Sequence, residues 1–250
     1  MRWIYLSPHF DDAVLSCGGI IWQQAQAGHP VEIWTLCAGH PPPGPLPPLA
    51  AQLHARWQTG AQAVSARRAE DIAACQAVSA AWRHFDLPDC IYRRLPGGEP
   101  LIHDNDDLWV DRLDDRAAPD VARVRAWLAA NLPGRCRLVA PLTIGGHIDH
   151  HIVRSAAQSL GRALWYYADY PYVATHHVNV RAWLGPGWSR RRQPVTPQGL
   201  AAWQAGIAQY TSQITTFWGN LEEMRAAMQD YLARGGNTLW VRPQKSLQPG

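Results

Sequence analysis

Residues 3–12 read Trp-Ile-Tyr-Leu-Ser-Pro-His-Phe-Asp-Asp and organise the N-terminal part of the chain. The apolar run from Trp3 to Leu6 is typical of a buried strand, and the pattern from Ala13 to Ala27 predicts a helix that ends at Gly28. The next apolar run, residues 31–37, predicts a second strand. The order strand, helix, strand indicates an α/β fold in which residues 7–12 lie at the carboxyl end of the first strand.

A second polar cluster occupies a similar position much farther along the chain. It reads Gly-Gly-His-Ile-Asp-His-His over residues 145–151. The apolar run from Leu138 to Leu142 comes just before it and predicts another strand. Sites in open α/β sheets lie at the carboxyl ends of strands, so we expect the two clusters to meet.

Together the two clusters supply ligands for one metal ion. His9 and Asp12 are three residues apart, and His150 would come from the second loop. Three N/O ligands that leave one position for water are typical of catalytic zinc, although another divalent cation would fit the same donors. Asp11 then remains as a general base, and the combination predicts a hydrolase. Alternatively, His9 is a capped turn residue and both carboxylates favour a helix N-terminus. One cluster alone would favour the metal site and the turn-and-cap interpretation equally. The presence of both clusters favours the metal site.

These motifs resemble those of the LmbE/PIG-L family of zinc-dependent N-deacetylases. The first family motif, Pro-His-x-Asp-Asp, matches residues 8–12, and the second, His-x-Asp-His, matches residues 147–150. Three weaker matches extend the resemblance over residues 3–215: Arg67 to Glu70, Leu87 to Asp89, and Tyr210 to Gln213.

The resemblance implies that an acetyl group is removed from a small molecule or glycoconjugate that contains N-acetylglucosamine. His147, oriented through Asp149, would stabilise the oxyanion and protonate the leaving amine. Arg67 would reach toward the substrate, and Asp89 would accept hydrogen bonds from sugar hydroxyls. Without the resemblance, these two are a surface ion-pair residue and a turn residue. The adjacent Arg68 is an alternative to Arg67.

Two positions depart from the family pattern. The family member of mycothiol synthesis has a tyrosine two residues before the histidine of the second motif, where this chain has Gly145. The acidic residue that often follows the Asp-Asp pair is Ala13 here. Four tyrosines around Pro171 are either packing residues or a wall on which a sugar stacks: Tyr166, Tyr167, Tyr170 and Tyr172.

The remaining pattern predicts helices over residues 55–82, 118–131, 149–160, 198–217 and 221–233, and a strand over residues 163–167. Residues 103–116 and 185–197 are expected as connections. The Pro-rich segment 41–48 is either a surface connection or a rim of the pocket. We therefore predict an α/β, largely parallel Rossmann-like sheet with helices on both faces, the LmbE-like deacetylase fold, without a dinucleotide-binding Gly-x-Gly-x-x-Gly motif. A single domain is expected over residues 1–250, with an irregular C-terminal part from about residue 171.

The composition excludes several kinds of partner. The formal net charge is +3, and Arg190-Arg191-Arg192 is the nearest approach to a basic run, so nucleic acid is not expected. No stretch approaches the roughly 18 apolar residues of a membrane helix, and the N-terminus enters a strand at once. Five cysteines without short paired spacing are expected as buried free thiols. These features predict a cytoplasmic protein.

Two further functions remain open from the sequence. The same metal site could serve a hydrolase of another amide or ester, or the chain could be a noncatalytic sugar- or metal-binding relative. Asp11 favours an enzyme, because a binding protein needs no base beside the metal. The group attached to the amino sugar, the oligomeric state and the pathway are not determined by these motifs.

Overall fold

The computed structural model, which describes residues 1–242, contains a seven-stranded sheet in the order β3-β2-β1-β4-β5-β7-β6. The strands from β3 to β5 in this order run parallel, and β7 and β6 extend the sheet in antiparallel fashion. The predicted largely parallel Rossmann-like sheet is therefore confirmed. The strands are β1 (Arg2–Ser7), β2 (Val31–Thr35), β3 (Ala81–His84), β4 (Cys136–Pro141), β5 (Leu164–Tyr167), β6 (Ser189–Arg192) and β7 (Thr238–Val241).

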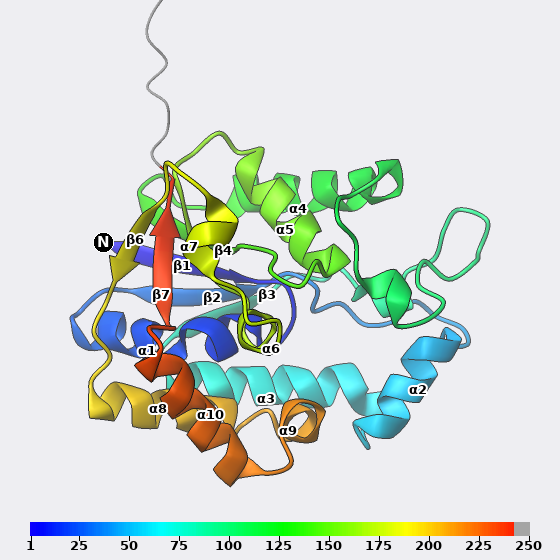
Figure 1. The fold of residues 1–250 in the computed structure, drawn as a ribbon. Helices are drawn as coiled ribbons and strands as arrows, with labels where there is room; N and C mark the ends of the chain where they lie inside the picture. The colour runs from blue at the N-terminus through cyan, green and yellow to red at the C-terminus, as the bar shows by residue number, and fades with distance from the viewer. Residues whose placement is uncertain (243–250) are drawn as a thin grey trace, which may run out of the picture.

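Helices cover both faces of this sheet (Figure 1). One face carries α1 (Asp12–Gln26), α3 (Ala63–Ala77), α8 (Pro197–Ile207) and α10 (Leu221–Ala233), and the other carries α4 (Ala118–Asn131) and α5 (Ile148–Gln158). α1 and α8 approach closely, because a Cβ added at Gly18 would lie 2.3 Å from Trp203 Cδ1. The Trp203 indole also donates a hydrogen bond of 2.7 Å to the Val14 carbonyl. In the described residues, no helix is both long and apolar enough to cross a bilayer.

The single long helix expected over residues 55–82 is wrong. The chain instead forms α2 (Pro48–Arg56), a 3-10 turn η1 (Gly60–Gln62), α3 and the edge strand β3. Gln58 and Gly60 adopt left-handed φ angles of 55° and 53° between α2 and α3, and Ser79 follows α3 with a φ of 58°. β3 forms by pairing with β2, with Trp82 opposite Ile33. Such pairing depends on a distant segment and overrides the helix propensity of the Ala-rich sequence.

The C-terminal part also differs from the sequence-based expectation. Residues 189–192, expected in a loop, form β6, which pairs with β7, a strand that was not predicted. The expected helix 198–217 is two helices, α8 and α9 (Thr211–Phe217). Two short helices, α6 (Tyr172–Thr175) and α7 (Val180–Leu184), follow β5. The three arginines of β6 are exposed, so this edge strand has a polar sequence that resembles a loop.

The other predicted helices and strands agree with the structure in type, and their ends shift by a few residues. Residues 41–47 form neither helix nor strand, as expected from their prolines, but Pro48, the last residue of the expected segment, is the first residue of α2. The connection expected over residues 103–116 contains only the short 3-10 turn η3 (Asp106–Leu108) and the start of η4 (Asp115–Ala117).

Two of the weaker sequence motifs contact each other and tie α3 to α9. The Glu70 carboxylate accepts hydrogen bonds from the Ser212 amide at 2.8 Å and from its hydroxyl at 2.7 Å. The neighbouring Asp71 is buried and accepts from the Tyr210 hydroxyl at 2.7 Å and from Thr35 at 2.9 Å. These segments therefore hold a C-terminal helix beside the sheet, since buried carboxylates require such partners.

Candidate metal centre

The two polar clusters meet at the carboxyl edge of the parallel strands. β1 and β4 are neighbours in the sheet, with Tyr5 opposite Val139. The next strands in the sheet lie on opposite sides of this pair, because β2 lies beside β1 and β5 lies beside β4. A sheet with such a switch point leaves room for a site between the loops that follow the two central strands. The loops after β1 and β4 bring together the residues expected there: His9, Asp11, Asp12, His147, Asp149 and His150.

Of the three expected ligands, Asp12 lies next to both of the others. Asp12 Oδ2 lies 3.3 Å from His9 Nδ1 and 3.3 Å from His150 Nε2. In a tetrahedral site with metal distances of 2.0–2.1 Å, neighbouring ligand atoms lie about 3.3–3.4 Å apart. His150 is fully buried and its Nε2 makes no hydrogen bond, which would be costly unless another group satisfied this nitrogen. The donor set therefore fits a metal ion.

Other groups of donors overlap this one. Nitrogens of His9, His147 and His150 lie within 4.8 Å of one another, so His147 also lies beside two of the expected ligands. Two more groups share the carboxylate of Asp149, one with His9 and Cys37 and one with Cys90 and His147. An ion pair with Arg93 already compensates the charge of Asp149, which makes that carboxylate a weaker cation ligand.

A carboxylate that the sequence analysis missed orients His150. Asp169 follows β5, the next strand along the sheet, and its Oδ1 lies 2.7 Å from His150 Nδ1. Its other oxygen accepts a hydrogen bond of 2.9 Å from the Ile144 amide. Burial of the His150 ring favours its neutral form, but the carboxylates of Asp12 and Asp169 raise the pKa of His150 to about 9. The signal for Asp169 was its position two residues after the end of a predicted strand.

Asp11 lies beside the convergent donors and contacts Arg67. The carboxylate is 5% exposed, and its Oδ2 lies 3.5 Å from a guanidinium nitrogen of Arg67. Burial raises the pKa of Asp11 to about 7, although Arg67 acts in the opposite direction. Arg67 packs 4.8 Å from the centre of the Trp57 ring, whereas Arg68 points elsewhere and donates to the Ala38 carbonyl at 2.5 Å. Of the two arginines, Arg67 is the one at the site.

His147 and Asp149 interact in an unexpected way. The backbone N–H of Asp149, rather than its carboxylate, donates to His147 Nδ1 at 3.2 Å. The carboxylate is directed to Arg93, to the Cys90 amide at 3.0 Å and to His9 Nε2 at 3.1 Å. Burial opposes its ionisation, but Arg93 and the nearby histidine hold the pKa of Asp149 well below its usual range. Burial and neighbouring rings lower the pKa of His147, which is therefore neutral at pH 7.

Asp89 lies at the edge of the centre. Its Oδ1 accepts a hydrogen bond of 3.2 Å from the Ile91 amide and caps the 3-10 turn η2 (Cys90–Tyr92). Its Oδ2 lies 3.7 Å from His9 Nε2, and the side chain is 14% exposed. Asp89 can therefore cap the turn through one carboxylate oxygen and still border the metal centre through the other.

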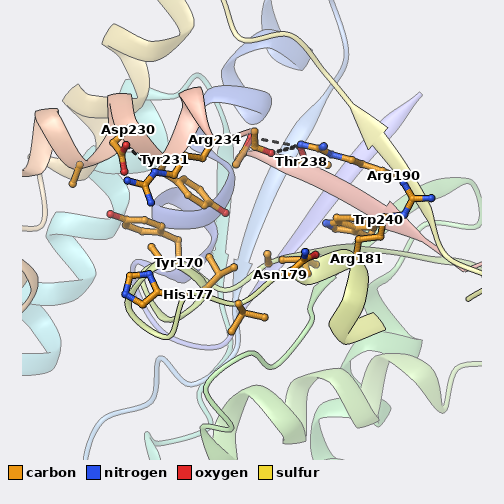
Figure 2. Close-up of a pocket in the computed structure, with 18 residues that line it drawn as sticks. Tyr170, His177, Asn179, Arg181, Arg190, Asp230, Tyr231, Arg234, Thr238 and Trp240 are labelled. Atoms are coloured by element: carbon orange, nitrogen blue, oxygen red, sulfur yellow. Dashed lines mark hydrogen bonds and ion pairs between the residues drawn. The ribbon is translucent and has the colours of Figure 1, made fainter. Parts of the chain in front are cut away.

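A separate cavity lies away from this centre. It has a volume of about 630 Å³ and lies between the segment after β5, the end of α10 and strands β6 and β7. Figure 2 shows Tyr170 and Tyr231 on one side of it and Arg190 and Trp240 on the other. None of the convergent metal-centre residues lines this cavity. Of the four clustered tyrosines, Tyr170 therefore belongs to the cavity rather than to a wall of the metal centre.

Sequence comparison identifies relatives of this chain. The family described as PIG-L, GlcNAc-PI de-N-acetylase, matches residues 4–160. The chain is similar to a 2'-N-acetylparomamine deacetylase of Niallia circulans, with 25% identity over 89% of this chain and 84% of the relative. A 2'-N-acetylparomamine deacetylase of Streptomyces fradiae is 28% identical over 69% of this chain and 58% of its own length.

Structure comparison points to the same group of proteins. The zinc-inhibited form of teicoplanin deacetylase Orf2 superposes with a TM-score of 0.81 and 30% identity, over 98% of this chain and all of the other. The A40926 pseudoaglycone deacetylase Dbv21 superposes with a TM-score of 0.71 and 29% identity, over 97% of this chain and 96% of the other. The chain therefore belongs to the PIG-L family of de-N-acetylases and is a hydrolase of the deacetylase type.

Proposed function

We propose that this enzyme removes the acetyl group from an N-acetylated amino sugar, in a small molecule or glycoconjugate that contains N-acetylglucosamine, and releases acetate and a free amine. The observation that carries the proposal is the convergence of Asp12 with His9 and His150, with Asp11 alongside. The similarity to deacetylases of acetylated amino sugars supports this substrate class. The N/O donor set supports zinc as the metal, and another divalent cation would fit the same donors.

The roles of the site residues follow from their contacts. His9, Asp12 and His150 would hold the metal, with Asp169 fixing the ring of His150. A metal bound there supplies Lewis-acid chemistry, which polarises the amide carbonyl and favours ionisation of water. Asp11 accepts the proton of the attacking water, because a buried carboxylate with a pKa of about 7 is half ionised at neutral pH.

His147 would act as a hydrogen-bond donor to the developing oxyanion. Its Nδ1 accepts the Asp149 amide, so the proton of the neutral ring resides on Nε2. A ring whose pKa is lowered donates a hydrogen bond readily but carries no extra proton to release. The proton taken up by Asp11 is then the one available to the leaving amine. Asp149 supports both histidines, through its amide to His147 and its carboxylate to His9.

Arg67 and Asp89 are proposed as the groups that grip the polar part of the substrate. Arg67 lies in contact with Asp11, and Asp89 lies close to His9. We also propose a cytoplasmic location, supported by five cysteines that are all free, as is usual in a reducing compartment.

We propose in addition that residues 1–250 form a single domain. The contacts of α8 with α1 and α3 support this, because they join the C-terminal part to the N-terminal helices.

The proposal is tested by incubating metal-loaded protein with a panel of N-acetylated amino sugars and measuring acetate and new primary amine. Asp11→Asn should retain the metal and lose about 100- to 10,000-fold in kcat, the usual contribution of a general base. Asp12→Ala should lose metal and activity together. Hydrolysis of simple esters or other amides with no acetyl sugar accepted would replace this proposal with the broader hydrolase. Full activity of both variants would refute the assigned roles.

A further inference from the structure

An exposed tryptophan, Trp109, lies beside the loop after β4 that carries His147. Trp109 is 41% exposed, although its ring lies edge-on to both His147 and Tyr172 with centroid distances of 5.4 Å. Its backbone is fixed against the loop after β4 by a bridge to His147 and by the hydrogen bond of 2.8 Å from the Val110 amide to the Gly146 carbonyl. The neighbours of Trp109 thus hold the indole in place but leave much of it exposed to solvent.

Two glycines allow this arrangement. Gly145 and Gly146 have φ angles of +96° and +81°, which side chains rarely adopt. A Cβ at Gly145 would lie 2.8 Å from the ring of Tyr172, and a Cβ at Gly146 would lie 2.9 Å from the Val110 carbonyl oxygen. Segments that are far apart in the sequence therefore pack directly on the turn that carries His147.

Tyr172 completes a corner with Trp109. Its ring lies 6.0 Å from that of His150, so it faces the proposed metal ligands as well as the indole. The Tyr172 side chain is only partly buried. We define Trp109 and Tyr172 as the aromatic corner of the site.

We propose that the aromatic corner is the subsite for the pyranose ring that carries the acetamido group. The apolar face of the ring would stack on the Trp109 indole, and a sugar oxygen would take the hydrogen bond of the Tyr172 hydroxyl. Because the indole is adjacent to His147, such a ring would lie next to the group that we propose as the hydrogen-bond donor to the oxyanion. Aromatic side chains present a large rigid contact area, which suits this role. The inference rests on the proposed deacetylation of an amino sugar.

The test separates ring binding from chemistry. Trp109→Ala should raise KM for an N-acetylglucosaminide about 10-fold or more and leave kcat within about twofold, because a contact made equally in ground and transition states affects KM alone. Trp109→Phe should restore most of the loss. An acyclic acetamide, N-acetylethanolamine, should be hydrolysed equally by the parent and Trp109→Ala. Trp183→Ala is the matched control, since Trp183 is 49% exposed and lies outside the corner.

A binding measurement keeps the inference independent of turnover. Glucosamine, the product sugar, should quench the intrinsic fluorescence of the parent and of Trp183→Ala, and this quenching should be lost in Trp109→Ala. Tyr172→Phe should keep the quenching and weaken glucosamine binding several-fold, since it removes one hydrogen bond. Equal losses on the cyclic and acyclic substrates, with quenching intact, would overturn the subsite and make Trp109 a support for His147. Glucosamine quenching without any deacetylation would retain the subsite and reject the proposed reaction.

Discussion

Neutralising Asp169 should weaken metal binding although this residue is not a ligand. In the parent, its carboxylate accepts from His150 Nδ1 at 2.7 Å and from the Ile144 amide at 2.9 Å. With both oxygens occupied by donors, Nδ1 of the ring keeps its proton, and Nε2 is the nitrogen that would bind the metal after it releases its own proton. In Asp169→Asn, the new NH₂ group must oppose one of these two donors. Either the amide loses its acceptor or the ring is driven to the wrong tautomer.

The size of the effect follows from this geometry. Loss of a carboxylate that orients a ligand histidine typically costs 10- to 100-fold in metal affinity, or about 1.4–2.7 kcal/mol. Asp169→Ala should add a folding defect, because the buried Ile144 amide would have no acceptor, at a cost of about 1–3 kcal/mol. Asp169→Ala thus removes both acceptors, whereas Asp169→Asn keeps one of them.

The assay is a competition titration of zinc against a chromophoric chelator, combined with thermal unfolding of metal-free protein. Asp230→Asn is the control, because this exposed carboxylate pairs with the exposed Arg234, far from the metal-centre residues. We expect Asp169→Asn to shift the titration by 10-fold or more while the control follows the parent. A zinc affinity equal to that of the parent in both Asp169→Asn and Asp169→Ala would refute the orientation argument and remove Asp169 from the metal centre.

Three further predictions concern separate parts of the molecule. His150→Ala should lower zinc occupancy sharply, as measured by elemental analysis, and full occupancy would exclude it as a ligand. Arg67→Ala should lower kcat/KM with zinc retained, whereas Arg68→Ala should not; equal kinetics in both would return Arg67 to a structural role. Gly18→Ala should lower the free energy of unfolding by about 1–3 kcal/mol, because its Cβ would overlap Trp203. Chemical denaturation measures this loss, and Gly134→Ala is the control because nothing lies within 4 Å of a Cβ at Gly134. Equal stability of the two variants would contradict the prediction.

Local patterns predicted the central part of the fold well. The strands before the two polar clusters are long apolar runs buried on both faces, and their sequences carry that information directly. The edge strands β3 and β6 were missed, because their residues are largely exposed and their strand form depends on pairing with a distant neighbour.

The sequence by itself determined the chemistry of the candidate ligands and base, since the spacing of His9 and Asp12 and the cluster around His150 are local features. Only the tertiary structure distinguished Arg67 from Arg68, because one step along a helix turns a side chain by about 100° and sequence alone does not fix that phase. Tertiary structure likewise brought Asp169, Arg93 and the aromatic corner to the centre. Each comes from a different connection, and their meeting depends on the order of the strands in the sheet, a set of long-range contacts that no local pattern encodes.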